Sequence, residues 1–453
     1  MKTKRMIALA LAVLMFLLTF AGCAQAPMTV QGPTLDKLTP TDKLVIYTAG
    51  SRYPWMQRQV ELYERLYDVD VEVVTVAVDA YAERVTGDLA GGAGPDVLFL
   101  ELLPNTDIAK AALNNNFLDL TEILASDEDF SEDDYVAGVF DTGRFKGRQY
   151  VIPTTFTTPL YLSAKSGLED IGFVWESVEK TSDFLEEIAR IMQDSRQRGS
   201  PLRIMSTKNM LFDFFGDSGI RLIDYENNVV LPDEAALDEF LHAYKTYFPY
   251  DYDESGLIFA YSAGANELVQ SSYYFWPEAG NNIERISENI DTLIENDVGY
   301  VLQYFPGQTG ETYGDVYGKA AISASSKNQL NAYNFIKMLL SAEVQCDRKL
   351  RTNGIPVLKE AHETIILGKT QWTTTTKDGQ SFTYSGYRSK QLSNEELDSL
   401  LETLTHVDRF NPFVSYNLFS MMKDSMLPFF KDEKSYENCR AELKNKLTFY
   451  LSE

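Results

Sequence analysis

The chain has 453 residues, 66 of them acidic and 41 basic, so its formal net charge is -25. This charge argues against nucleic acid or another polyanion as a partner, and three widely spaced histidines argue against a histidine-rich metal site. About 410 residues follow the first 40, a length that suits two domains rather than one.

The N-terminus predicts the compartment of the protein. Basic residues precede an uncharged run over residues 6–20, which is shorter than the ~20 residues of a membrane-spanning helix and has the length of a secretory signal core. With the Ala-Gly-Cys sequence that ends at Cys23, this segment resembles a bacterial lipoprotein signal, although the Leu of that family is Phe20 here. The resemblance implies that Cys23 becomes the mature N-terminus and carries the lipid. An ordinary signal peptide with an incidental Cys23 is the alternative.

We therefore expect a signal peptide over residues 1–22 and a tether over residues 23–40, which are polar and contain several prolines. Removal of the signal, with its three positive charges, changes the net charge from -25 to -28. No other run of about 20 apolar residues occurs, so nothing else is expected to span a bilayer. The predicted location is the extracytoplasmic face of the cell membrane, with Cys23 as the lipid anchor.

The first third of the mature chain alternates predicted strands and helices. The order strand, helix, strand, helix, strand, helix is typical of an α/β fold with a mostly parallel sheet and helices on both faces. Ligands of such sheets bind outside the carboxyl ends of the strands, which points to residues 49–55 and 101–105. The strands are predicted over 44–47, 71–78 and 96–100, and the helices over 56–67, 80–90 and 108–113.

The rest of the chain is predicted more coarsely. Helices are expected over 182–194, 234–248, 331–340, 394–404 and 436–451, and a β-hairpin over 372–387. Cys346 and Cys439 could pair in an oxidising compartment, but we favour two unpaired, buried cysteines.

Several short stretches, taken in chain order, resemble one family. They are Gly94 to Val97 ahead of a strand, residues 150–155 with 160–161, residues 298–306 with 318–328, residues 341–345 and residues 353–356. Together they cover most of residues 43–360 and are similar to carbohydrate-type (family 1) extracellular solute-binding proteins of bacterial ABC importers. The family usually has Tyr-Tyr-Asn-Lys after its first crossing between lobes, whereas this chain has Tyr-Leu-Ser-Ala-Lys at residues 161–165.

The resemblance implies a two-lobed periplasmic-binding-protein-like fold with a hinge of several crossing segments. The N-lobe would comprise residues 41–152 and 303–345, and the C-lobe residues 153–302 and 346–453. Such a protein would be a monomer that closes around a small polar solute, a mono- or oligosaccharide, and delivers it to the membrane subunits of an ABC permease. We expect no cofactor, no metal and no catalytic residue.

The candidate binding residues follow from the chemistry of sugars, whose apolar faces suit aromatic rings and whose hydroxyl rims suit carboxylates, amides and Arg. The family has a helix that leads to an aromatic residue of the cleft where this chain has residues 264–276. Core packing, helix capping and hinge shape are the alternative roles of these residues. The candidates are Tyr53, Trp55, Glu101, Thr154, Thr155, Tyr274, Trp276 and Tyr304.

Short motifs that would indicate an enzyme or a metal site are incomplete in this chain. The stretch Gly-Asp-Ser-Gly at 216–219 is similar to a serine-protease loop, but all three histidines follow Ser218, so a turn is favoured. Residues 251–256 resemble the start of a calcium loop, but its twelfth position is Ser262 instead of Glu. A secreted carbohydrate-active hydrolase or lyase is the alternative enzyme, and a ligand-sensing lipoprotein without transport is a third class. The solute itself stays open, and Arg52 leaves room for an anion.

Overall fold

The structure is a computed structural model that describes residues 32–41, 43–197, 210–251, 276–277, 285–375 and 381–452. The predicted signal peptide, Cys23, Tyr274 and most of the segment similar to a calcium loop lie outside the described residues. Within the described ranges, no helix is both long and apolar enough to cross a membrane.

A five-stranded sheet with the order β2-β1-β3-β14-β6 forms the core of the part that we call the first lobe. Strands β1 (Lys43–Thr48), β2 (Asp70–Thr75) and β3 (Val97–Phe99) are parallel, as predicted. Strand β14 (Lys319–Ile322) pairs antiparallel with β3 and with β6 (Ile152–Pro153), although it lies far from both in sequence. The second strand ends at Thr75, three residues before its predicted end.

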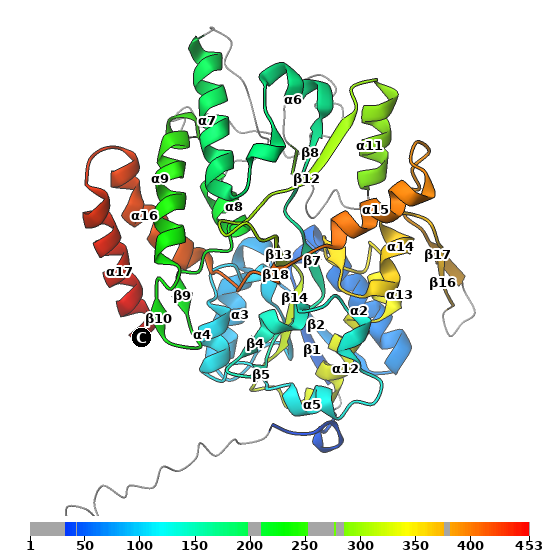
Figure 1. The fold of residues 1–453 in the computed structure, drawn as a ribbon. Coiled ribbons are helices and arrows are strands. Elements are labelled where there is room, and N and C mark those ends of the chain that lie inside the picture. Colours follow the sequence, from blue (N-terminus) through cyan, green and yellow to red (C-terminus); the bar gives the residue numbers. More distant parts are fainter. Residues whose placement is uncertain are drawn as a thin grey trace, which may run out of the picture.

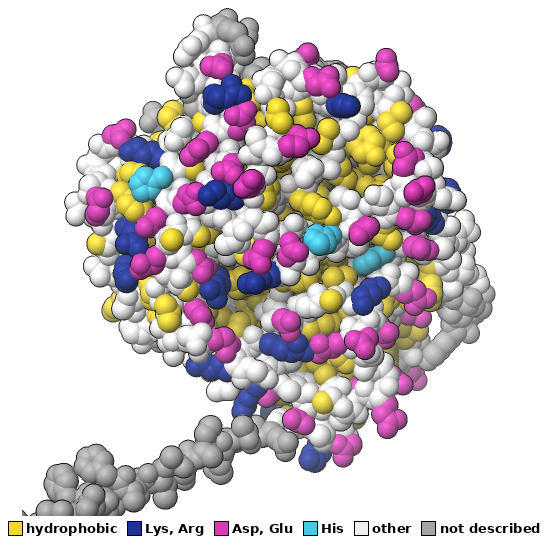
Figure 2. All heavy atoms as spheres, viewed as in Figure 1, with side chains coloured by type: hydrophobic (Ala, Val, Ile, Leu, Met, Phe, Trp, Pro, Cys, Tyr) yellow, Lys and Arg dark blue, Asp and Glu magenta, His cyan; other side chains and the backbone are white. Residues whose placement is uncertain are grey.

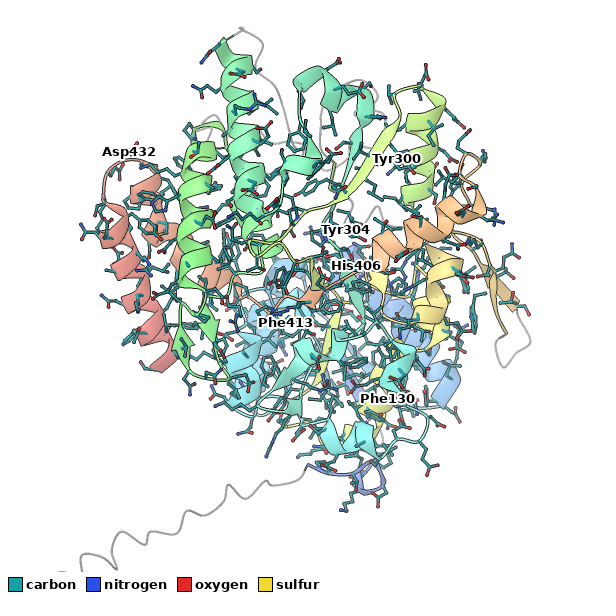
Figure 3. All side chains as sticks on the ribbon, in the orientation of Figure 1. Phe130, Tyr300, Tyr304, His406, Phe413 and Asp432 are labelled. Carbon is teal, nitrogen blue, oxygen red and sulfur yellow. The ribbon has the colours of Figure 1, made fainter. Side chains whose placement is uncertain are left out.

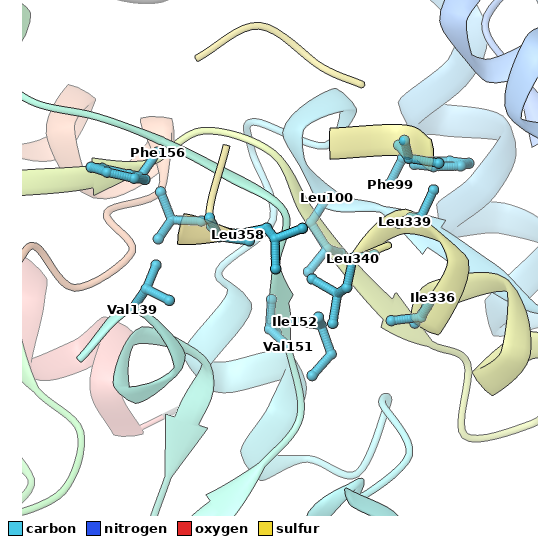
Figure 4. Packing of buried hydrophobic residues seen from close by; sticks show 14 of the residues in the cluster. Phe99, Leu100, Val139, Val151, Ile152, Phe156, Ile336, Leu339, Leu340 and Leu358 are labelled. Carbon is cyan, nitrogen blue, oxygen red and sulfur yellow. The ribbon is translucent and has the colours of Figure 1, made fainter. Parts of the chain in front are cut away.

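Helices pack on this sheet through aromatic and aliphatic side chains (Figures 1 and 4). The Phe335 ring lies 5.2 Å from the Tyr63 ring and 6.2 Å from the Phe99 ring, so two helices and β3 meet in one apolar cluster. The helices of this lobe are α2 (Pro54–Tyr67), α3 (Tyr81–Ala90), α4 (Ile108–Leu113), α5 (Thr121–Ala125), α12 (Gln329–Leu339) and α13 (Ala342–Gln345), and the short strands β4 (Arg144–Phe145) and β5 (Arg148–Gln149) form a hairpin.

The second lobe has a sheet with the order β11-β8-β12 and its own apolar cluster, in which Phe184 and Phe305 lie 5.0 Å apart. Helices α16 and α17 stand beside α9 on one side of this lobe (Figure 1). Its elements are β8 (Leu160–Ala164), α6 (Lys165–Ile171), α7 (Thr181–Gln197), α8 (Met210–Asp217), β9 (Ile223–Asp224), β10 (Val229–Val230), α9 (Glu234–Asp251), β11 (Trp276–Pro277), α11 (Ile286–Glu295), β12 (Tyr300–Tyr304), α16 (Tyr416–Phe430) and α17 (Tyr436–Ser452).

A four-stranded sheet with the order β15-β7-β13-β18 joins the two lobes. It contains β7 (Thr155–Thr157), β13 (Tyr313–Val316), β15 (Ile355–Pro356) and β18 (Arg409–Phe410), which come from four separate passages of the chain. Three of these passages include segments that the sequence predicted as crossings. The fourth, β18, pairs parallel with β13 and was not predicted.

A segment between the third and fourth passages lies along one side of the molecule. It contains α14 (His362–Ile365), the predicted hairpin, formed by β16 (Trp372–Thr375) and β17 (Ser381–Tyr384), and α15 (Asn394–Thr405). Buried Asp291 of α11 fastens this segment, because Tyr387, Ser389 and the amides of Lys390 and Gln391 all donate to its carboxylate.

Cys346 and Cys439 are free and buried, as predicted. Cys346 belongs to the first apolar cluster and Cys439 to the second, so different cores enclose them. On the face shown in Figure 2, acidic and basic side chains are interspersed.

Candidate functional site

A cavity of about 340 Å³ lies between the two lobes, at the carboxyl end of β3. The first lobe contributes residues between Leu100 and Ile108, and the second lobe contributes Phe212 and Phe215 of α8. Sheet geometry predicted a ligand site at residues 101–105, and the cavity lies against part of that segment. The other lining residues are Gly216, Ile220, Asp315, Val316, Tyr317, Lys319 and residues 411–416.

Exposed aromatic rings distinguish this cavity. Phe212, Tyr317 and Tyr416 line it, and they retain 38%, 44% and 47% of their accessible surface. Phe212 packs edge-on against Phe419 with ring centroids 4.8 Å apart, and its ring lies 6.2 Å from that of Tyr416. The Phe212 and Tyr416 rings are therefore supported by Phe419 of the second lobe while part of their surface stays exposed, which suits stacking against an apolar ligand face.

Polar groups stand among the rings. The Asn411 amide donates to the Gly216 carbonyl at 2.7 Å and to Oδ1 of Asp315 at 2.8 Å, so it links the second lobe to β13 of the hinge. Glu101 Oε2 accepts a hydrogen bond from the Lys319 backbone N–H at 3.3 Å. Acceptors and donors of this kind can satisfy hydroxyl groups of a ligand.

Burial shifts the pKa values of the ionisable groups in and beside the cavity. Desolvation raises the pKa of Glu101 to about 7, although nearby Lys319 partly opposes the shift. Desolvation likewise raises the pKa of Asp315 to about 6, against the effects of Asn411 and Lys319. Desolvation also lowers the pKa of Lys319, because burial disfavours any charged form. Asp217, next to the cavity-lining Gly216, has a pKa well above its usual range because of burial and the charges of Asp315 and Asp213.

Trp55 and Thr154 lie one layer behind the main cavity. Both line a small void of about 10 Å³ that shares Glu101 and Lys319 with the main cavity. This space holds about one water molecule and no sugar ring. The Trp55 ring packs edge-on against Phe99 at 5.4 Å and lies 6.2 Å from the Tyr53 ring. Residues Tyr53 and Trp55, at the end of the predicted ligand segment 49–55, therefore support the layer of side chains beneath Glu101.

Thr155 makes contacts within the hinge, and Tyr304 of β12 packs beside the end of α15. Thr155 is fully buried; its hydroxyl donates to the Asn353 carbonyl at 2.7 Å and accepts from the Gly318 N–H at 2.9 Å. Tyr304 lies beside His406, with ring centroids 5.4 Å apart, near the end of α15 (Figure 3). Among the described residues that line the main cavity, neither one appears.

The prediction that a helix ends at Trp276 is wrong. Trp276 and Pro277 form strand β11, which pairs antiparallel with Leu162 and Tyr161 of β8. β11 is an edge strand, where a proline is tolerated because one side of the strand needs no ladder hydrogen bond. Residues 264–275, including Tyr274, lie outside the described residues.

Sequence reasoning missed most of the cavity wall. Tyr317, Asp315 and Lys319 lie in or beside the predicted return crossing, so their place at the hinge was a usable signal. Phe212 and Tyr416 carried no such signal, because tertiary packing brings α8 and the start of α16 together. The cavity-lining residues that were not predicted include Phe212, Asp315, Tyr317, Lys319, Asn411, Phe413 and Tyr416.

The motifs that suggested enzymes have structural roles where they are described. The Ser218 hydroxyl donates to the Phe215 carbonyl at 2.7 Å and accepts from the Ile220 N–H at 3.2 Å, so it closes a turn after α8. No group of three His, Cys, Asp or Glu side chains in the described part of the chain is arranged to hold a metal ion.

Two α/β lobes, four connecting strands and a cavity between the lobes define a hinged, periplasmic-binding-protein-like fold. The chain belongs to the bacterial extracellular solute-binding protein family, whose model matches residues 48–345. This family places it outside the cytoplasm. No curated protein matches the chain in sequence.

Solved structures with the same fold include three receptors. The sugar-binding protein MalE from Xanthomonas citri aligns with a TM-score of 0.61 at 16% identity, over 90% of this chain and 97% of its own. The GacH receptor of Streptomyces glaucescens, studied with acarbose, aligns with a TM-score of 0.57 at 16% identity, over 91% of this chain and 98% of its own. The substrate-binding protein Lmo0181 from Listeria monocytogenes, in complex with cycloalternan, aligns with a TM-score of 0.56 at 14% identity, over 90% of this chain and 98% of its own.

Proposed function

We propose that this protein captures a carbohydrate in the cavity between its lobes and delivers it to an ABC permease. The observation that carries the proposal is the group of exposed rings, Phe212, Tyr317 and Tyr416, at one opening between two hinged lobes. Exposed aromatic side chains are costly unless a partner covers them, and sugar rings present apolar faces of matching size. Similar folds that bind acarbose and cycloalternan support the same class of ligand.

Each candidate residue receives a role in this proposal. Glu101, Asp315 and Asn411 satisfy sugar hydroxyls, and the three rings cover sugar faces. Trp55, Tyr53 and Thr154 hold the layer beneath Glu101, and Thr155 holds the hinge. Tyr274, Trp276 and Tyr304 stay proposed contacts, which they would make only as the lobes close.

The cellular setting is part of the proposal. Signal removal and lipid attachment at Cys23 would place a monomer on the outer face of the cell membrane, with residues 24–40 as a tether. The closed lobes would form the surface that the permease recognises, because closure is the change that the ligand stabilises. The protein itself would leave its ligand chemically unchanged.

A thermal-shift screen of residues 24–453 tests this function. A ligand that binds only the native state raises the melting temperature with concentration. We expect stabilisation by one or more mono- or oligosaccharides, and none by polyamines, peptides or phosphorylated compounds. Tyr416→Ala and Tyr317→Ala should weaken binding about tenfold, whereas Phe449→Ala, which removes an aromatic ring that is 65% exposed but does not line the cavity, should not.

The outcomes separate the alternatives. A saccharide recovered intact after long incubation supports a receptor. A saccharide that is cleaved would favour a hydrolase or lyase that uses the carboxylates of the cavity. Binding confined to another class of compound would support a receptor whose ligand is not a sugar. Transport is distinguished from sensing by uptake of the bound saccharide in cells with and without the protein.

A further inference from the structure

Carboxylates outnumber cations among the described residues of the main cavity. Among the described residues that line it, two are carboxylates, Glu101 and Asp315, and one is a cation, Lys319. The described part of the wall therefore holds more carboxylates than cations.

The one cation is largely occupied by the protein. The Lys319 ammonium donates to the Val316 carbonyl at 2.8 Å and to the Tyr317 carbonyl at 3.2 Å. It also lies 5.1 Å from the centre of the Phe413 ring, within range of a cation–π contact. Two of its three N–H donors are thus used within the hinge, and an anionic ligand would find little free positive charge here.

The carboxylates keep acceptor capacity. Asp315 accepts from Asn411 through Oδ1, and no described residue donates to its Oδ2. Glu101 accepts from the backbone N–H of Lys319 and from its own backbone. Burial disfavours the ionised form of both groups, so each would gain from a cation brought into the cavity.

We propose that the cavity selects a saccharide that carries a protonated amine, such as a hexosamine oligomer, over its N-acetylated or uronic-acid counterparts. This inference rests on the proposed function. The exposed rings Tyr317 and Tyr416 would hold the sugar faces, and Asp315 and Glu101 would accept from the ammonium group. Hydrogen bonds between charged partners are about twice as strong as neutral ones, so the charge decides between ligands of similar shape.

The test is calorimetric titration of residues 24–453 at near-neutral pH with three oligosaccharides of equal length: glucosamine, N-acetylglucosamine and galacturonate oligomers. We expect the glucosamine oligomer to bind at least about tenfold more tightly than the N-acetylated one, and the galacturonate oligomer to bind most weakly. Asp315→Asn and Glu101→Gln should each reduce this preference, and the double variant should abolish it. Asp424→Asn, an exposed site on α16, is the control.

Each result bears on the inference separately from the proposed function. Equal binding of the three oligomers, or tightest binding of galacturonate, would overturn the inference and leave a carbohydrate receptor in place. A preference for the amine that survives in the folded double variant would overturn the assignment to Asp315 and Glu101. If no saccharide of any charge binds, the proposed function itself fails.

Discussion

The hydroxyl of Tyr450, in the last helix of the second lobe, donates a hydrogen bond at 2.8 Å to Oδ2 of Asp107 in the first lobe. Tyr225, also of the second lobe, donates to the same oxygen. The other oxygen of Asp107 accepts from the Lys110 N–H at 3.0 Å and caps α4, while the Lys110 ammonium donates to the Tyr450 carbonyl at 2.7 Å. Asp107 therefore ties together the two lobes beside the cavity.

Tyr450→Phe is predicted to favour the open arrangement of the lobes. A hydrogen bond to a charged group contributes about 1.5–3 kcal/mol, so its loss should weaken apparent ligand affinity about tenfold. Small-angle X-ray scattering should show a larger radius of gyration for the unliganded variant. Tyr436→Phe is the matched control, because its hydroxyl donates to Asp238 within the second lobe. Equal effects of both variants on affinity would contradict the role of Asp107.

The hinge is predicted to reject a single methyl group at Gly318. A Cβ atom there would lie 2.2 Å from Thr352 Oγ1, 2.4 Å from Thr154 Oγ1 and 2.7 Å from Thr155 Oγ1. Since these hydroxyls come from two other passages of the chain, Gly318→Ala should cost about 1–3 kcal/mol of unfolding free energy. Chemical denaturation measures this cost.

Gly87→Ala serves as a comparison, because it should raise the free energy of unfolding instead of lowering it. Its Cβ atom would meet no atom within 4 Å, and it lies inside helix α3. Alanine is the better helix former, so this variant should gain about 0.5–1 kcal/mol. A Gly318→Ala protein as stable as the wild type would refute the close approach of the three passages.

Glu101 is predicted to make stability fall as pH rises. Its folded pKa of about 7 exceeds the ordinary value of 4.5, so between these values the native state binds more protons than the unfolded state. The free energy of unfolding then decreases with rising pH, by up to about 1.4 kcal/mol per pH unit for one such group. Asp315, with a pKa of about 6, acts in the same direction.

Glu101→Gln removes this contribution, so its stability relative to the wild type should increase from about pH 4.5 to pH 7. Denaturation at several pH values measures the difference. The comparison with the wild type matters because buried His362, whose pKa burial lowers to about 4, acts in the opposite direction below its ordinary value of 6.5. A flat difference for Glu101→Gln would mean that Glu101 is ionised throughout.

The carboxylate of Asp291 is predicted to be essential for docking the segment after the hairpin. Asp291→Asn places amide N–H groups opposite the donors of Ser389, Lys390 and Gln391, so about 1–3 kcal/mol of stability should be lost. Glu295→Gln, on the same helix, alters only an exposed contact with Gln391 and should change stability by less than about 0.5 kcal/mol. Hydrogen exchange should show lost protection over residues 387–391 in Asp291→Asn alone.

Much of the first lobe was predictable because its elements are long and periodic. The parallel strands and the helices α2, α3 and α4 agree with the sequence pattern, since burial on one helix face or in a central strand leaves a local signature. The helices α7, α9, α12, α15 and α17 and the hairpin were also predicted. The lobe boundaries stay a prediction.

The hinge and the cavity were less predictable, for physical reasons. Strands such as β15 and β18 have two residues each, too few for any alternation to be recognised. Helix α16 was not predicted; it contains Pro428, a residue that usually indicates a helix end. The aromatic wall of the cavity depends on the approach of α8 and α16, whose cause lies in tertiary packing. Glu101 was predicted because sheet topology alone places the end of β3 at a ligand site.

Asn411 follows the fourth strand of the hinge, and its amide holds both the Gly216 carbonyl and Asp315 in the cavity wall. Rotation of the lobes and entry of a solute must therefore disturb the same NH₂ group. Its two side-chain protons would act as a built-in reporter in ¹⁵N-edited NMR spectra. One pair of resonances would register both the occupancy of the cavity and the angle between the lobes, without any dye or spin label attached to the protein.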